Sequence, residues 1–193
     1  MITMTTNILI VGVGGQGTVL ASKILGQLFI DRGLDVKVSE GHGRSQPGGS
    51  GITFVRAGEE VSSPLIEMGT ADVIISFELL EAQRYAAYLK KGGTIIVNSQ
   101  QIDPMPVITG AAKYPEDIPG TLSGLNISAK YVDATGLAIE AGNAKAANVA
   151  LLGAASKFIG GSEEEWEKAV LACVPAKFAA LNKSAFELGR SKN

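Results

Sequence analysis

Cysteine and histidine are almost absent from the sequence, which contains only Cys173 and His42 of these two types. A single cysteine excludes an intrachain disulfide, a zinc site built from cysteines and an iron–sulfur cluster held by this chain alone. We therefore expect a reducing, cytoplasmic environment for the protein. A serine-type triad would depend on His42 as its base, and Ile52 interrupts a Gly-x-Ser-x-Gly pattern around Ser50.

Long apolar runs and an excess of positive charge are also missing. No apolar run approaches the roughly 20 residues that span a bilayer, so we expect no membrane segment. The formal net charge of -2 argues against nucleic acid as the main partner. Gly-x-x-x-x-Gly-Lys-[Ser/Thr] and His-Glu-x-x-His are absent, which excludes a P-loop ATPase and a zincin. The sequence contains no self-sufficient catalytic constellation and no metal site.

The 193 residues, of which 46% are hydrophobic, suffice for one domain with a substantial core, and we see no linker that divides them. Residues 7–17 read as a β-branched strand and a glycine turn, and a helix pattern follows. Residues 52–56 form a further strand that interrupts the strand–helix alternation. We therefore predict a three-layer α/β/α Rossmann-like domain over residues 1–193. Its sheet is mixed and mostly parallel, and its C-terminal third is helical.

The glycine turn matches Gly-x-Gly-x-x-Gly at Gly12, Gly14 and Gly17. Backbone N–H groups at the start of the following helix would face an anion, so the candidate cofactor-binding residues are Gly14, Gly15, Gln16 and Gly17. Glu40 ends a predicted strand over 35–40, where a Rossmann domain places the acid that binds ribose hydroxyls. Alternatively, these glycines only allow the helix to pack closely on the strand, and both interpretations remain open.

The segment 41–51, Gly-His-Gly-Arg-Ser-Gln-Pro-Gly-Gly-Ser-Gly, is polar and rich in glycine. Such a loop can present successive N–H groups to an anion, and Arg44 adds positive charge. It is either a loop ordered by a partner or a flexible hairpin connection. The candidate residues for substrate or partner contact are Glu40, His42, Arg44, Gly48, Gly49 and Ser50.

Further along the chain, a helix is expected over 78–89, ended by Lys90, Lys91 and glycine, and a buried strand over 94–98. Residues 99–124 contain four prolines and predict an irregular surface excursion with a short strand at 107–108. Ser162 and Glu165 have the spacing of a capping box, which predicts the start of a helix.

Motifs along nearly the whole chain occur in a recognisable order. The sequence reads Gly-Val-Gly-Gly-Gln-Gly at 12–17, Ser-Glu-Gly-His-Gly at 39–43, and Gly-Gly-Ser at 48–50 before Phe-Val-Arg at 54–56. Ser-Pro-Leu-Ile at 63–66, Phe-Glu at 77–78, Lys-Gly-Gly at 91–93 and Gly-Asn at 142–143 continue the pattern. Together they resemble the γ-type domain of 2-oxoacid:ferredoxin oxidoreductases. Within that family the chain is most similar to indolepyruvate ferredoxin oxidoreductase β subunits.

This resemblance implies a component of an enzyme that oxidatively decarboxylates a 2-oxoacid on thiamine diphosphate, passes electrons through iron–sulfur clusters to ferredoxin, and releases an acyl-CoA. The family's thiamine motif, Gly-Asp-Gly, and its cysteine runs are absent here. The cofactors are therefore expected on partner subunits, with coenzyme A as co-substrate, and the isolated chain should be inactive.

The chain departs from the family pattern at two positions, Pro47 and Lys145, where the family often has a basic residue and an arginine. A homodimer of the isolated chain is left open. The alternative function is a stand-alone or regulatory NAD- or nucleotide-binding protein.

Overall fold

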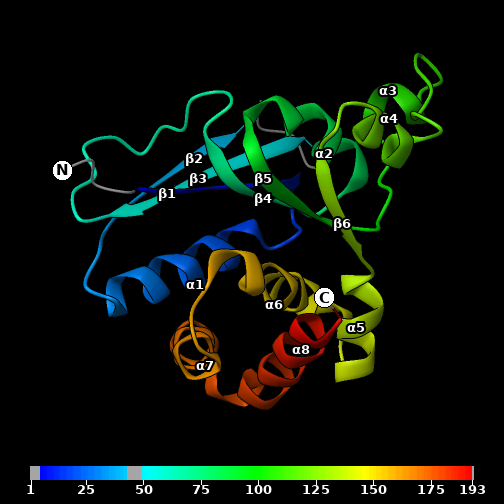
Figure 1. Ribbon diagram of the computed structural model, residues 1–193. Coiled ribbons are helices and arrows are strands. Elements are labelled where there is room, and N and C mark those ends of the chain that lie inside the picture. The colour runs from blue at the N-terminus through cyan, green and yellow to red at the C-terminus, as the bar shows by residue number, and fades with distance from the viewer. Residues whose placement is uncertain (1–4, 43–48, 193) are drawn as a thin grey trace.

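A six-stranded sheet forms the centre of the structure, a computed structural model that describes residues 5–42 and 49–192 (Figure 1). The strands are β1 (Thr6–Val13), β2 (Asp35–His42), β3 (Ser50–Gly58), β4 (Ala71–Ser76), β5 (Leu89–Asn98) and β6 (Ser128–Val132). They lie in the order β2-β3-β1-β4-β5-β6. Strands β1, β4, β5 and β6 pair in parallel, whereas β3 is antiparallel to both β1 and β2.

Helices cover both faces of this sheet (Figure 1). One face carries α1 (Thr18–Asp31), α5 (Ala134–Ala141), α6 (Ala147–Ile159), α7 (Glu163–Cys173) and α8 (Ala179–Ser191). The other carries α2 (Leu79–Tyr85), α3 (Met105–Ile108) and α4 (Ile118–Gly124). Short 3₁₀ turns are η1 (Ala86–Tyr88), η2 (Ala144–Ala146) and η3 (Ala176–Phe178). The predicted α/β class, with its mixed and mostly parallel sheet and helical C-terminal third, is confirmed. Within the described residues, no helix combines the length and apolarity needed to cross a bilayer.

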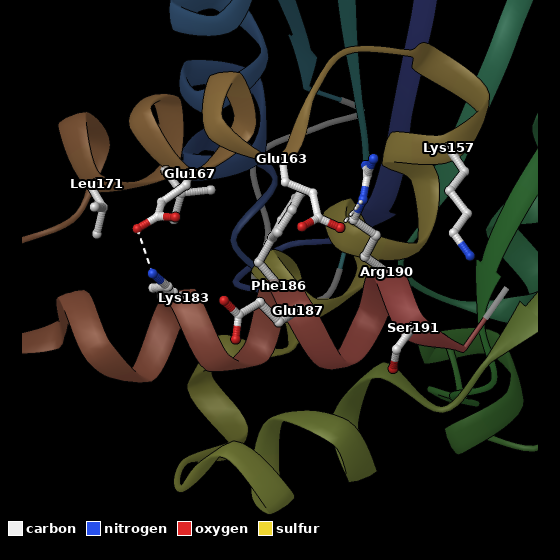
Figure 2. Close-up of a pocket in the computed structure, with 10 residues that line it drawn as sticks. Lys157, Glu163, Glu167, Leu171, Lys183, Phe186, Glu187, Arg190 and Ser191 are labelled. Carbon is white, nitrogen blue, oxygen red and sulfur yellow. Dashed lines mark hydrogen bonds and ion pairs between the residues drawn. The ribbon is translucent and has the colours of Figure 1, made fainter.

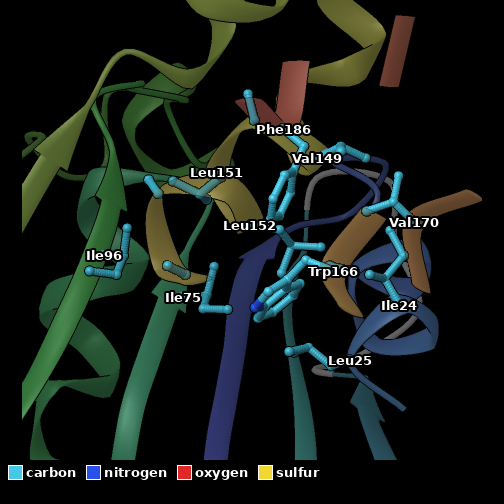
Figure 3. Close-up of a cluster of buried hydrophobic side chains, with 14 of the residues drawn as sticks. Ile24, Leu25, Ile75, Ile96, Val149, Leu151, Leu152, Trp166, Val170 and Phe186 are labelled. Atoms are coloured by element: carbon cyan, nitrogen blue, oxygen red, sulfur yellow. The ribbon is translucent and has the colours of Figure 1, made fainter. Parts of the chain in front are cut away.

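Strand β1 illustrates how the sequence divides the core into two layers. Ile8 and Ile10 belong to the apolar cluster under α1 and α6, and Leu9 and Val11 belong to the cluster under α2. Successive residues of a strand point to opposite faces of the sheet. Because helices cover both faces here, all four side chains are fully buried. Figure 3 shows the larger cluster, in which Trp166 lies among side chains from the sheet, α1 and α6.

Helices α6 and α8 approach each other through two glycines. A Cβ atom built on Gly189 would collide with the backbone carbonyl of Ala150, and one built on Gly153 would collide with the carbonyl of Phe186. The close approach also lets Arg190 of α8 donate to the buried Ser156 hydroxyl of α6 at 2.6 Å. The two helices therefore pack at a distance that only glycine permits at these positions.

The start of α7 confirms the predicted capping box. The Ser162 N–H donates to the Glu165 carboxylate at 2.7 Å, and the Glu165 N–H donates to the Ser162 hydroxyl at 3.2 Å. Trp166, one residue further, is fully buried and donates its indole N–H to the Gly160 carbonyl at 2.9 Å.

The predicted strand at 107–108 is wrong, because Val107 and Ile108 lie in the one-turn helix α3. Pro104 and Pro106 lie at its start, where proline favours a helical first turn over a strand. The irregular excursion over 99–124 also contains α4, which begins where the Asp117 carboxylate accepts from the Gly120 N–H at 2.7 Å. An Asp cap before Pro119 is a helix signal that the proline count obscured.

The helix predicted over 78–89 is too long, since α2 ends at Tyr85 and a 3₁₀ turn follows it. Strand β5 already begins at Leu89, which pairs with Ala71 before a register shift. The Lys-Lys-Gly-Gly segment therefore forms an irregular stretch of strand and does not cap a helix. Its glycines fit this role, because Gly92 has φ +82° and a Cβ on Gly93 would lie 2.8 Å from the Asp72 carbonyl.

Candidate functional site

The candidate site lies at the edge of the sheet where the parallel strands β1, β4 and β5 end, which we call the carboxyl edge. The glycine turn follows β1 here, and Gly15 and Gly17 have φ +95° and +85°, which glycine adopts without strain. Gly17 is the N-cap of α1, and no side chain of the described residues caps that helix. In open α/β sheets this edge is the usual place for ligands.

Gln16, a predicted cofactor-binding residue, holds the turn together. Its side-chain oxygen accepts from the Val13 N–H at 2.7 Å, and its amide donates to the Phe77 carbonyl at 3.0 Å and to Gln100 at 3.1 Å. Through these bonds the glycine turn is fixed to the ends of β4 and β5. The Gln16 side chain acts here as a structural link between three strands.

A shallow cleft of about 520 Å³ lies beside the turn. Its polar lining includes Gln16, Asn98, Gln100, Thr135, Lys145 and Asn148. Asn148 of α6 approaches Gly17 so closely that a Cβ atom there would lie 2.5 Å from the Asn148 amide nitrogen. Gly17 thus packs closely against α6 in a conformation that favours glycine, which supports the packing interpretation of the glycine motif.

Glu40 does not lie beside the glycine turn. The register places Glu40 opposite Thr53 of β3, and Thr53 opposite Ile10 of β1, so β3 separates Glu40 from β1. Two strand spacings of ~4.8 Å put the backbones about 10 Å apart. The exposed Glu40 side chain instead lines a groove of about 550 Å³ with residues of α1 and α7, such as Ile30 and Cys173. The Rossmann arrangement of glycine turn and ribose-binding acid is therefore not formed.

The predicted loop is described only at its two ends. His42 ends β2, its side chain lies outside the described residues, and Arg44 and Gly48 lie wholly outside them. At the other end, the Gly49 carbonyl accepts from the Gly14 N–H at 3.0 Å. Ser50 begins β3 directly opposite Val13. The structure thus brings two of the predicted groups together, the glycine turn and the end of the loop at 49–50.

Ser50 contacts a polar cluster on α2 that the sequence analysis did not identify as a site. Its hydroxyl donates to the Glu81 carboxylate and lies 3.0 Å from the Tyr85 hydroxyl. Arg84 donates to the other Glu81 oxygen at 2.7 Å. Burial raises the pKa of Glu81, and the hydrogen bond from Ser50 and the charge of Arg84 oppose that shift.

A second buried carboxylate, Glu78, lies one helical turn before Glu81. It caps α2 by accepting from the Glu81 N–H at 2.9 Å, and it also accepts from the Ile102 N–H at 3.2 Å and from the Tyr114 hydroxyl. Burial, the hydrogen bond to Glu78 and its charge raise the pKa of Tyr114. Two acids three residues apart, next to the apolar Leu79, Leu80 and Ala82, were a usable sequence signal for this cluster.

A separate pocket of about 390 Å³ lies between α7 and α8 (Figure 2). Its apolar floor includes Phe186, and four of the charged residues on its rim form two ion pairs. Lys183 lies 2.7 Å from Glu167, and Arg190 lies 3.3 Å from Glu163. None of the predicted site residues that the structure describes lines this pocket.

Metal ligands are not gathered anywhere in the described parts of the chain: no three His, Cys, Asp or Glu side chains there lie close enough to hold an ion. Cys173 is partly buried, and burial raises the pKa of its thiol. A thiol with a raised pKa is a poor nucleophile and a poor metal ligand at neutral pH. The donor set of this chain does not fit an iron–sulfur cluster.

Residues 7–192 match the protein family described as pyruvate ferredoxin/flavodoxin oxidoreductase. The chain is 44% identical over 188 residues to the indolepyruvate oxidoreductase subunit IorB of Thermococcus kodakarensis, and the match covers 95% of this chain and 93% of that protein. The structure is similar to the gamma subunit of the keto/oxoacid ferredoxin oxidoreductase of Geobacter sulfurreducens, with a TM-score of 0.71, 26% identity and 97% coverage of both chains.

A third match concerns a longer protein. The 2-oxoglutarate:ferredoxin oxidoreductase of Magnetococcus marinus has the same fold over 97% of this chain but only 30% of its own length, with a TM-score of 0.71 and 22% identity. The fold described above therefore also occurs as one part of a larger polypeptide.

Proposed function

Because the chain belongs to the pyruvate ferredoxin/flavodoxin oxidoreductase family, we propose that it is the non-cofactor subunit of a 2-oxoacid:ferredoxin oxidoreductase. Such an enzyme converts a 2-oxoacid and coenzyme A into an acyl-CoA and carbon dioxide, and two electrons leave through iron–sulfur clusters to ferredoxin. The observation that carries the proposal is the family match over residues 7–192, together with 44% identity to an indolepyruvate oxidoreductase subunit over nearly the whole of both chains.

The cofactors belong to partner chains in this proposal. A single cysteine cannot ligate a cluster, and the Gly-Asp-Gly motif of thiamine diphosphate sites is absent from the sequence. Thiamine diphosphate, when bound to the partner, supplies the carbanion-stabilising chemistry of decarboxylation. This chain's contribution is to dock on the catalytic subunit and to shape access to its active site. A cytoplasmic location belongs to the same proposal, and the low cysteine content supports it.

The surface used for docking is the carboxyl edge. The glycine turn, the loop end at Gly49 and Ser50, and the α2 cluster meet there, and segment 41–51 begins and ends at this edge. We assign substrate, coenzyme A or partner contacts to Glu40, His42, Arg44, Gly48, Gly49 and Ser50, with Arg44 as the charged group. Indolepyruvate is the first substrate to test, given the relative with 44% identity.

The alternative, a nucleotide-binding protein, lacks structural support. Strand β3 separates Glu40 from the glycine turn, and Gly17 of that turn packs against Asn148 of α6. Calorimetry with NAD should therefore detect no micromolar binding to the isolated chain.

The test of the main proposal is reconstitution. The chain is co-expressed with a subunit that carries the thiamine and cluster motifs, and viologen reduction is measured with coenzyme A and a panel of 2-oxoacids that includes indolepyruvate and pyruvate. We expect activity in the complex and none in the isolated chain. Equal activity of the partner without this chain, or an inactive complex with every 2-oxoacid, would contradict the proposal.

A further inference from the structure

Glu81 is a buried carboxylate whose two oxygens serve different segments. Its side chain is 2% exposed. One oxygen accepts from Ser50 at the start of β3, and the other accepts from Arg84 on α2 at 2.7 Å. A carboxylate in this position links a strand and a helix that are 31 residues apart in sequence.

The direction of the hydrogen bonds within the cluster follows from the number of protons. The Ser50 hydroxyl has a single proton, and it donates this proton to Glu81, which as a carboxylate can only accept. The Tyr85 hydroxyl, 3.0 Å from Ser50, must therefore be the donor in that contact. The result is a directed chain from Tyr85 through Ser50 to Glu81, with Arg84 donating from the other side.

The cluster also fixes the carboxyl edge. Ser50 follows Gly49, whose carbonyl accepts from Gly14 of the glycine turn at 3.0 Å. Glu81 therefore holds α2, the start of β3 and, through one further bond, the turn after β1. Stability alone is a weak reason for such a group, because well-packed apolar residues often replace a buried ion pair without loss.

Arg84 differs from the other members because its side chain is 44% exposed. A guanidinium has five N–H groups in a planar fork, and one of them donates to Glu81. No other hydrogen-bond partner of Arg84 occurs among the residues that the structure describes. The Arg84 guanidinium is thus fixed by its bond to the buried Glu81, which also holds Ser50 at the start of β3, and much of the Arg84 side chain faces solvent.

From this geometry we propose that Glu81 is a positioning residue, which holds Arg84 and Ser50 so that Arg84 binds an anionic oxygen group of a substrate. The inference rests on the proposed function, whose substrates carry such groups: the carboxylate of the 2-oxoacid and the phosphates of coenzyme A. A planar fork binds both kinds of oxyanion with two parallel hydrogen bonds.

The decisive variant is Arg84→Lys in the reconstituted complex, because lysine still neutralises Glu81 but lacks the fork. Loss of the bidentate contact should raise one KM about tenfold, with kcat changed less than about twofold. The matched control is Arg32→Lys. Arg32 also pairs with a glutamate, Glu165 at 3.0 Å, but it lies on the opposite face of the sheet, between α1 and α7. That control should leave both KM values unchanged.

Glu81→Gln provides the second variant. Glutamine still accepts from Ser50 but no longer holds Arg84 by charge, so the same KM should rise although Arg84 is present. The double variant should be no worse than Arg84→Lys, since Glu81 acts through Arg84.

An increased KM for the 2-oxoacid assigns Arg84 to the carboxylate, and an increased KM for coenzyme A assigns it to phosphate. Unchanged KM values in Arg84→Lys, with an unchanged melting temperature, would overturn the inference, because Arg84 would then only neutralise Glu81. An inactive wild-type complex would instead contradict the proposed function, so the two failures are distinguishable.

Discussion

The two faces of the sheet are joined to their helices by different means. On the α6–α8 side, apolar side chains and two glycines bring backbones into direct contact, and Trp166 and Phe186 stack with ring centroids 5.5 Å apart. On the α2 side, near the carboxyl edge, two buried carboxylates hold the chain by hydrogen bonds to Ser50, Arg84 and Tyr114. Close packing tolerates no added volume, whereas directed polar bonds fix the positions of individual groups. We therefore propose that the first side mainly provides stability and that the second side provides the functional contacts.

Gly189→Ala should break the α6–α8 contact and give the largest effect. Its Cβ atom would collide with the Ala150 carbonyl, and forced separation of two packed helices should lower the free energy of unfolding by about 3 kcal/mol. Urea unfolding followed by the fluorescence of Trp166, the single tryptophan, measures this change.

Gly26→Ala is the matched control, because Gly26 lies in α1 and, within the described residues, no atom beyond its chain neighbours and the backbone of its own helix lies within 4 Å of an added Cβ. Alanine there should raise the free energy of unfolding by up to about 1 kcal/mol through helix propensity. Equal destabilisation by the two substitutions would mean that the close approach of α6 and α8 does not set the difference.

Arg44→Ala should show the opposite pattern at the carboxyl edge. The free energy of unfolding should change by no more than about 0.5 kcal/mol, as for ordinary surface substitutions. Loss of a charged contact should cost about 1.5–3 kcal/mol of transition-state stabilisation. This cost appears as a lower kcat/KM of the reconstituted complex. If melting temperature, assembly and kcat/KM all equal those of the wild type, the segment 41–51 is only a hairpin connection.

Ser162→Ala tests the face that carries α6, α7 and α8, with a smaller expected loss of stability than Gly189→Ala. The capping box satisfies N–H groups at the start of α7, and its loss should cost about 1 kcal/mol of stability with no change in either KM. Ser162→Asp restores an acceptor at the same position and should recover most of that loss. An altered KM in Ser162→Ala would contradict the division between the two faces.

Local signals explain what the sequence predicts correctly. The β-branched run at 8–11, the glycine turn and the capping box each depend on neighbours within a few residues, and the structure contains all three. The strand predicted at 107–108 failed because prolines that start α3 outweighed the β-branched residues Val107 and Ile108. The early start of β5 depends on pairing with Ala71, a contact between distant residues that no local pattern reveals.

The same distinction applies to the site. The sequence predicts that residues 12–17 and 41–51 belong to the functional site. The structure brings the two segments together through the hydrogen bond from the Gly14 N–H to the Gly49 carbonyl. The sequence alone does not predict that β3 lies between β1 and β2 and so separates Glu40 from the glycine turn. Nor could it predict the contact between Ser50 and Glu81, since strand order and helix placement are set by the whole fold.

The smallest effects are opposite pH dependences of stability on the two faces. Burial raises the pKa of Glu81, so its contribution to stability is complete below the unfolded-state pKa and is lost as pH rises through the folded-state pKa. Two hydrogen bonds lower the pKa of Glu165, the larger effect coming from the Ser162 N–H and the smaller from Arg32. The contribution of Glu165 to stability is therefore complete above the unfolded-state pKa and is lost as pH falls through the folded-state pKa.

Unfolding free energies of Glu81→Gln and Glu165→Gln, measured against the wild type between about pH 3 and 8, separate the two cases. The stability difference, wild type minus variant, should decrease with rising pH for Glu81→Gln and increase for Glu165→Gln. The unaltered titrating groups contribute equally to both proteins of each pair, so the sign of each slope reports the substituted carboxylate. Slopes of the same sign would mean that the Ser50 and Arg84 contacts outweigh burial at Glu81, and the cluster would then stabilise the fold much as the capping box does.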